Sequence, residues 1–398
     1  MTTVRLRAYL VGALASALLA IAGPTLAANL NFVPTAQISL PNNQKIIAFD
    51  ISFVDSVIQL YFLADRTNKS TAVVQTSNSR LQVQLTANPP FAGATPSNDN
   101  AGPDGTLTVR HQESWNGDGP SQVKVINLFN RQTTHVIPTG GANRADEGCL
   151  DPRDNVALFA NDAESPFPFV SFISTTTYTV TDRITMDGTI NGGSVLPTPK
   201  ATNGIEQCQW DKDTGHFFIN IPEVNGPGND SQPGAVLEIN PVTHAILHQF
   251  NIPLASCAGP QGMAIGPSPQ ILLGCNATAN ANNPTAIINK FNGSIVATIN
   301  QQSGSDEVDF DPGNGLYFLA RRDAVGATQL LGIIDSVTFA SNSVFTANKN
   351  IPGRTAHSVA SDPILNQVYV PIPAGISNVC SSVGGIDANG CIAVFKAQ

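Results

Sequence analysis

The sequence predicts an all-β protein, a seven-bladed antiparallel β-propeller closed by its N-terminal strand. Three observations support this prediction: a long-period repeat, short strands with alternating apolar residues, and a composition rich in turn-forming residues. The repeat is an Asp or Gly, here called the anchor, with a short apolar strand following it. Successive anchors lie 47, 49, 60, 55, 45 and 51 residues apart, which is the length of one four-stranded blade. The anchors are Asp55, Gly102, Asp151, Asp211, Gly266, Asp311 and Asp362, and Gly102 marks a degenerate copy.

The first 27 residues are expected to be a signal peptide. Arg5 and Arg7 precede an apolar run over residues 8–22, which is short for a bilayer span, and small residues up to Ala27 provide a cleavage site. An uncleaved anchor helix is the alternative. Residues 28–398 are then predicted to form a single propeller domain, secreted or periplasmic, without a membrane span after cleavage.

Further strands follow the anchor strand in each repeat. Period-two alternation indicates a third strand over residues 121–127, 234–240 and 329–335, and a fourth over 294–299. The last repeat lacks an outer strand, whereas residues 30–40 form an extended segment with no blade of their own. Joining the two completes a seventh blade and removes an open edge. Long loops are expected at residues 111–120, 222–233 and 375–391, and helix is expected to be scarce.

The composition excludes some partners. Charged residues are only 12% of the chain, and the formal net charge is −9. Loss of Arg5 and Arg7 with the signal peptide makes it −11, and no basic cluster remains. Nucleic acid and anionic membranes are therefore not expected as partners. We expect a monomer that binds a small molecule or a protein at one face of the ring, and an acidic ring attracts cations.

Six cysteines in an exported chain favour disulfides over metal ligation, and no Cys-x-x-Cys spacing is present. The repeat alignment proposes one set of pairings among those that six cysteines allow. Cys149 and Cys208 stand just before the anchors of neighbouring blades, and Cys257 and Cys275 flank one anchor at equal distance. Cys380 and Cys391 would close the long loop of the last blade.

A second pattern stands five residues before each anchor. Because the first strand of a propeller blade lines the channel, equivalent positions should form a ring at one level. Acids are more frequent at this position than a 12% charged composition explains. The residues there are Asp50, Asp146, Glu206, Gln261, Asp306 and His357, with Ser97 in the degenerate copy and Asp99 close by; Glu147, Gln207 and Glu307 come one step later.

Several segments are similar to YncE-like, YVTN-repeat propellers of exported bacterial proteins. The segment 151–162 matches the "DP…N…A/V-N" strand pair of that family, and residues 123–128 and 356–363 match its repeat tails. The resemblance extends over nearly the whole mature chain and implies the propeller fold. It implies little about activity, because propellers carry many unrelated functions.

Two functions are compatible with the acidic positions. The first is a non-catalytic module that binds a ligand or partner through the acidic and His-containing channel mouth. The second is a metal-dependent hydrolase or lyase, similar in architecture to gluconolactonase-type propellers. A further alternative is that the same acids have a structural role or line a water-filled channel.

Oxygen ligands in a ring suit Ca²⁺ best, while a histidine also suits Mn, Fe or Zn. The candidate metal ligands are Asp50, Asp146, Glu206, Asp306 and His357, and the candidate catalytic residues are Glu147, Glu206, Glu307 and His357. The sequence contains no Gly-x-Ser-x-Gly, no phosphate loop and no His-Glu-x-x-His motif.

Overall fold

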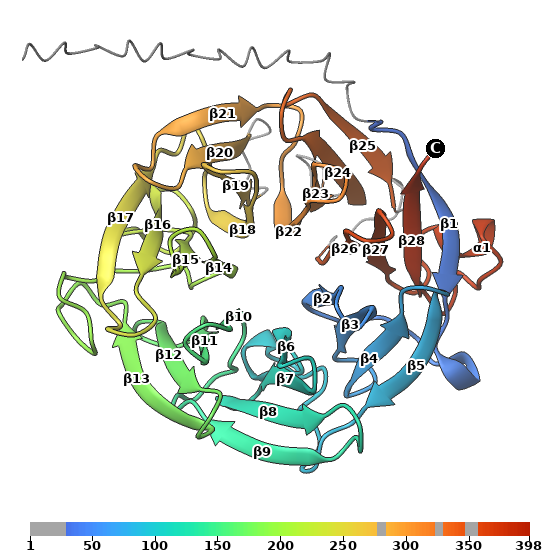
Figure 1. The fold of residues 1–398 in the computed structure, drawn as a ribbon, viewed down its shortest axis with the longest axis horizontal. Helices are drawn as coiled ribbons and strands as arrows, with labels where there is room; N and C mark the ends of the chain where they lie inside the picture. The colour runs from blue at the N-terminus through green and yellow to red at the C-terminus, as the bar shows by residue number, and fades with distance from the viewer. Residues whose placement is uncertain (1–28, 277–283, 323–328, 347–356) are drawn as a thin grey trace, which may run out of the picture.

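The computed structural model describes residues 29–276, 284–322, 329–346 and 357–398. Its strands form seven four-stranded sheets, and these are arranged as blades around a central channel (Figure 1). Neighbouring strands within each blade pair antiparallel, as in the ladder between β2 and β3. The predicted seven-bladed propeller is confirmed.

In the first six blades, the first strand lies innermost and the fourth lies on the outer rim (Figure 1). Blades 1 to 3 contain β2 (Ser52–Asp55), β3 (Leu60–Asp65), β4 (Ser70–Gln75) and β5 (Arg80–Leu85); β6 (Thr106–Val109), β7 (Glu113–Asp118), β8 (Gln122–Asn127) and β9 (Thr133–Pro138); and β10 (Gly148–Asp151), β11 (Val156–Asn161), β12 (Phe169–Ser174) and β13 (Thr179–Thr185). Blades 4 to 6 contain β14 (Cys208–Asp211), β15 (His216–Ile221), β16 (Gly234–Ile239) and β17 (Ile246–Ile252); β18 (Pro260–Ile265), β19 (Gln270–Cys275), β20 (Thr285–Asn289) and β21 (Ile295–Ile299); and β22 (Ser305–Asp311), β23 (Leu316–Arg322), β24 (Gln329–Asp335) and β25 (Ser341–Phe345).

The seventh blade joins the two ends of the described chain. It consists of β26 (Ala360–Asp362), β27 (Gln367–Ile372), β28 (Cys391–Ala397) and, on the rim, β1 (Phe32–Ile38). β1 pairs antiparallel with β28 from Phe32 opposite Ala397 to Ile38 opposite Ile392, and the two strands lie side by side in Figure 1. The predicted closure by the N-terminal strand is confirmed.

Helical structure in the described residues is short. It comprises η1 (Pro41–Asn43), η2 (Asn98–Asn100) and α1 (Val379–Ser382). None of the helices in this part of the chain has the length and apolar character needed to cross a membrane.

The aspartate anchors hold the hairpin between the first two strands of a blade. The Oδ1 atom of Asp55 accepts hydrogen bonds from the main-chain N–H groups of Val57 and Ile58 at 3.1 and 3.4 Å. Asp151 and Asp362 accept the same pair of bonds from the residues two and three positions later. Such Asx turns reverse the chain at a fixed point, so an aspartate recurs at the end of the first strand of most blades.

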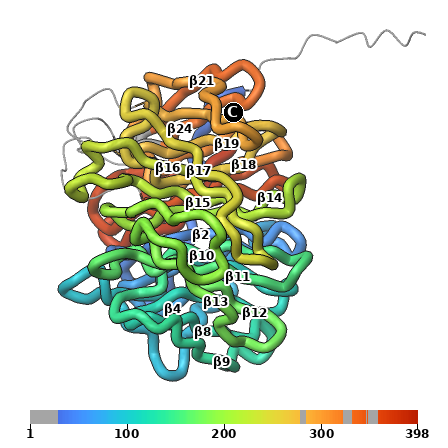
Figure 2. Tube along the Cα trace, turned by 90° about the vertical axis from the view of Figure 1, so that its left-hand side faces the viewer, coloured from blue at the N-terminus to red at the C-terminus, as the bar shows by residue number. Residues whose placement is uncertain are grey.

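Neighbouring blades pack through apolar side chains. Phe32 of β1 meets Phe318 of β23 edge to face, with ring centroids 5.2 Å apart. Tyr61 of β3 and Tyr369 of β27 stack at 4.7 Å. Figure 2 shows the molecule from the side, with elements of blades 5, 4, 3 and 2 one below another from β21 at the top to β9 at the bottom. Each blade therefore depends on both neighbours for its buried surface.

The three predicted disulfides are present. Cys149–Cys208 joins β10 to β14 across two blades, Cys257–Cys275 lies within blade 5, and Cys380–Cys391 joins α1 to β28. Three bridges fit a protein that folds in an oxidising compartment, as expected for an exported or extracellular chain.

Candidate functional site

Seven residues at one repeat position surround one mouth of the channel, and we call them the mouth ring. In blade 1, the N–H of Asp50 donates to the carbonyl of Ala64 at 2.9 Å, and the N–H of Ala64 donates to the carbonyl of Ile51 at 3.1 Å. Two successive residues thus oppose one, a bulge that redirects the side chain of the first. The mouth ring consists of Asp50, Asp104, Asp146, Glu206, Gln261, Asp306 and His357.

The degenerate repeat was aligned wrongly from the sequence. In blade 2, the N–H of Asp104 donates to the carbonyl of Gly117 at 2.9 Å, the same bulge contact as in blade 1. Asp104, and neither Ser97 nor Asp99, therefore occupies the ring position. The expected loop at 111–120 is also wrong, because residues 113–118 form β7. The anchor position of this blade is held by Val109 at the end of β6, which gives no turn signal.

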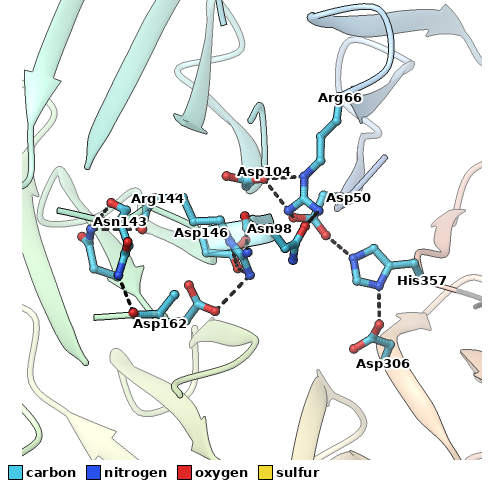
Figure 3. A network of polar contacts seen from close by, with 12 residues as sticks. Asp50, Arg66, Asn98, Asp104, Asn143, Arg144, Asp146, Asp162, Asp306 and His357 are labelled. Carbon is cyan, nitrogen blue, oxygen red and sulfur yellow. Dashed lines mark hydrogen bonds and ion pairs between the residues drawn. The ribbon is translucent and has the colours of Figure 1, made fainter. Parts of the chain in front are cut away.

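Arg66 lies between two acids of the mouth ring (Figure 3). Its Nε donates to Oδ1 of Asp104 at 2.6 Å, its Nη2 pairs with Oδ2 of Asp50, and its Nη1 donates to the Asn98 side chain at 2.8 Å. All three charged side chains are buried. Burial raises the pKa of Asp50, but the charges of Arg66 and His357 outweigh it and hold that pKa well below its usual range.

Arg144 holds a second pair of carboxylates. Its Nε and Nη2 donate to Oδ2 of Asp146 at 2.8 and 2.5 Å, and its Nη2 also reaches Oδ2 of Asp162 at 3.0 Å. Its Nη1 donates to the main-chain carbonyl of Asn98 at 2.7 Å, so the η2 segment accepts hydrogen bonds from both arginines. Burial and the nearby Asp146 raise the pKa of Asp162 to about 8. The sequence analysis predicted neither arginine as part of the site. Arg144 could have been predicted from its position two residues before the ring residue Asp146.

His357 bridges two acids of the ring. Its Nδ1 is bonded to Oδ2 of Asp306 and its Nε2 to Oδ1 of Asp50, as Figure 3 shows. Burial alone would lower the pKa of His357, but the two carboxylates raise it well above its usual value. The protonated ring donates through both nitrogens, and in that state neither nitrogen has a lone pair for a metal.

Three carboxylates around the arginines each have one oxygen without a hydrogen-bond partner in the described part of the chain. These buried atoms are Oδ2 of Asp104, Oδ1 of Asp146 and Oδ1 of Asp162. The other oxygen of each carboxylate is bonded to Arg66 or Arg144. Asp50, Asp104 and Asp146 each offer an oxygen, and the three ligand atoms lie within 4.8 Å of one another. Buried oxygens without a partner are unfavourable, so this position favours a cationic group.

The predicted glutamates lie in and next to the ring. Glu147 and Glu307 hydrogen-bond to each other although they belong to blades 3 and 6. Burial raises the pKa of Glu147, Glu206 and Glu307 well above the usual value, and neighbouring carboxylates add to the effect. Next to this pair, Gln207 accepts hydrogen bonds from the N–H groups of Met263 and Val308 at 2.6 and 3.3 Å.

The structure brings most of the predicted metal-binding residues into contact or ligand range, but Glu206 only through charge. Asp50, Asp306 and His357 form one hydrogen-bonded chain. Asp50 and Asp146 lie within metal-ligand range of each other and of Asp104, a residue that the sequence did not indicate. Glu206 influences the same site electrostatically, since its own pKa responds to Asp306. Hydrogen bonds and charge interactions therefore connect the mouth-ring residues other than Gln261.

The bridging contacts of His357 predict a pH-dependent stability. Because its folded pKa is raised, protonated His357 contributes stability that is fully present below its unfolded pKa of about 6.5. This contribution is lost as the pH rises through the raised value. We expect His357→Gln to lower the melting temperature most at acidic pH, with a difference that shrinks as the pH rises. Melting curves in EDTA from pH 5.5 to 9 measure this, and a difference independent of pH contradicts it.

No protein-family model matches the chain, and a search of curated proteins finds no match either.

Proposed function

We propose that this protein is a secreted or periplasmic binding module of the YncE-like propeller kind, and that its mouth ring binds a divalent cation. Ca²⁺ is the ion best matched to the ligands. The observation that supports the proposal is the pair of buried oxygens, Oδ2 of Asp104 and Oδ1 of Asp146, that have no partner in the described residues. Both residues belong to the cluster with metal-ligand spacing.

The spacing of the cluster fits a hard cation. Two oxygens that each lie about 2.3–2.6 Å from a Ca²⁺ ion are at most about 5.2 Å apart. The ligand atoms of Asp50, Asp104 and Asp146 lie within 4.8 Å of one another, so one ion can reach all three. All the ligands are carboxylate oxygens, which Ca²⁺ prefers over nitrogen.

The charge balance also favours a cation. The mouth ring and its neighbours contain more acids than bases, and the bases are Arg66, Arg144 and His357. Burial raises the pKa of Asp104 well above its usual value, and the charges of Asp146 and Asp50 add to this effect, even though Arg66 opposes it. A bound cation would offset this repulsion and stabilise the ionised carboxylates. The acids are Asp50, Asp104, Asp146, Glu147, Asp162, Glu206, Asp306 and Glu307.

We expect Ca²⁺ to bind the wild-type protein with about one ion per chain, as measured by equilibrium dialysis and elemental mass spectrometry after removal of EDTA. Asp104→Asn and Asp146→Asn each remove one carboxylate ligand and should weaken binding by about tenfold or more, a loss of about 1.4 kcal/mol. Asp154→Asn is the matched control, because it removes one acid from an exposed turn outside the ring. Equal binding by all four proteins would contradict the proposal.

A second candidate function is the hydrolase or lyase acting on a lactone, and the contact between Glu147 and Glu307 favours it. Two carboxyl groups in contact, with raised pKa values, can share one proton and act as an acid and base pair. A cation held by Asp104 and Asp146 would polarise a substrate carbonyl. Hydrolysis of a panel of sugar lactones, followed by proton release, tests this. Turnover that is the same in wild type and Glu307→Gln removes this candidate.

A further inference from the structure

The channel contains a second feature, a cavity of about 500 Å³, next to the mouth ring. The innermost strands of blades 1 to 4 line it, from the residue after the ring position to the hairpin turn at the other end. Ser56 and Val57 stand at that turn, and Val57 is 69% exposed, so the cavity extends to the face opposite the mouth ring. Its volume is within the range of small-molecule sites, about 300–1,000 Å³.

The walls of the cavity are largely apolar. The residues that give them this character are Ile51, Phe53, Leu107, Leu150, Trp210 and the Cys149–Cys208 disulfide. Asp55 also lines the cavity, but its carboxylate accepts hydrogen bonds from Val57, Ile58, Thr108 and His111. The walls therefore suit an apolar body and leave Asp55 little capacity to pair with a charged ligand.

One residue of β14 supplies a hydrogen-bond donor. Gln209 lines the cavity and is oriented by its Oε1, which accepts the N–H of Ile265 at 2.8 Å, and its Nε2 makes no hydrogen bond within the described residues. A ligand that meets this amide must supply an acceptor oxygen. Trp210 lines the cavity beside it, but its Nε1 is buried.

The inner end of the cavity disfavours anions. Glu147 lies there, in contact with Glu307, and the acids of the mouth ring are adjacent. An anionic ligand would add to the repulsion already present, whereas an uncharged one would not.

We infer that this cavity binds an uncharged small molecule with an apolar or aromatic body and a carbonyl oxygen, which accepts a hydrogen bond from Gln209. The site is separate from the proposed cation site, and neither requires the other.

The probe for this inference is Prodan, an uncharged aromatic ketone whose emission shifts to the blue in an apolar environment. We expect saturable binding of one Prodan per chain to the wild-type protein. Gln209→Leu should weaken binding by about tenfold, because it removes the amide donor but keeps a side chain of similar size. Gln249→Leu is the matched control, because Gln249 lies on β17 outside the cavity and its Nε2 already donates to Oδ1 of Asn251 at 2.9 Å. Trp115→Phe leaves Trp210 of the cavity wall as the single tryptophan, whose fluorescence Prodan should quench.

A second variant addresses the cavity itself. Leu150→Arg places a long charged side chain on its wall and should abolish binding, whereas Val242→Arg, on an exposed turn of blade 4, should not. Melting curves verify that each variant is folded. Absence of saturable Prodan binding to wild type overturns the inference, and so does binding that Gln209→Leu and folded Leu150→Arg leave unchanged. Asp104→Asn should bind Prodan normally, so failure of the cation proposal is distinguishable from failure of this one.

Discussion

Deletion of residues 29–41 should lower the free energy of unfolding by about 5 kcal/mol or more and reduce the melting temperature accordingly. β1 provides the rim strand of blade 7, and its loss exposes the hydrogen-bonding edge of β28. It also removes three buried side chains, Phe32, Ile38 and Leu40, and each contributes about 1.5–3 kcal/mol through burial. Urea denaturation of the deleted and intact proteins measures the difference.

Two point variants test the side-chain packing of β1 while the strand itself is retained. Ile38→Ala removes a side chain that is 3% exposed and should cost about 2–5 kcal/mol, whereas Val33→Ala changes a partly exposed side chain of the same strand and should cost less. A deleted protein with an unchanged unfolding midpoint would show that the ring does not depend on this strand.

Replacement of Arg66 by Met should destabilise the protein by about 3–5 kcal/mol near neutral pH, the usual effect of removing one partner of a buried ion pair. Arg66 is the cation between Asp50 and Asp104, and both carboxylates would remain buried without it. Arg66→Lys should fall between wild type and Arg66→Met, because an ammonium cannot contact both acids with the geometry of a guanidinium. Urea denaturation in EDTA provides the measurement.

The matched control is Arg153→Met, which removes an exposed arginine paired with Asp154 and should change stability by less than about 1 kcal/mol. Adding Asp104→Asn to Arg66→Met should restore part of the loss, since it removes one of the two carboxylates that Arg66 bonds and Asp50 still has His357 as a partner. If Arg66→Met and Arg153→Met have the same effect, the arginines do not hold the mouth ring together.

The fold was predictable because the signal for most blades is local. An aspartate that accepts N–H groups two and three residues later acts within its own hairpin, so Asp55, Asp151 and Asp362 mark blades without any knowledge of contacts. Blade 2 lacks this signal. Its turn residue His111 bonds instead to Asp55 of blade 1 at 2.7 Å, a contact between residues far apart in the sequence. The repeat was therefore placed at Gly102, and Asp104 was missed.

The acids of the mouth ring were predictable for the same reason. The arginines that neutralise them were not. Asp50, Asp146, Glu206 and Asp306 share one repeat position, which periodicity can detect. Arg66 follows β3 and Arg144 precedes β10, so the two arginines occupy different repeat positions and meet only when the ring closes. The cavity was missed as well, because its wall combines residues from four separate blades.

The most direct test of the cation site is a crystal of the protein soaked in Mn²⁺, a cation that is located by its anomalous scattering. The proposal predicts one peak in the mouth ring, at coordination distance from Oδ2 of Asp104 and Oδ1 of Asp146, and no peak there in Asp104→Asn. A mouth ring without a peak, in which Arg66 and Arg144 still hold the acids, would contradict it.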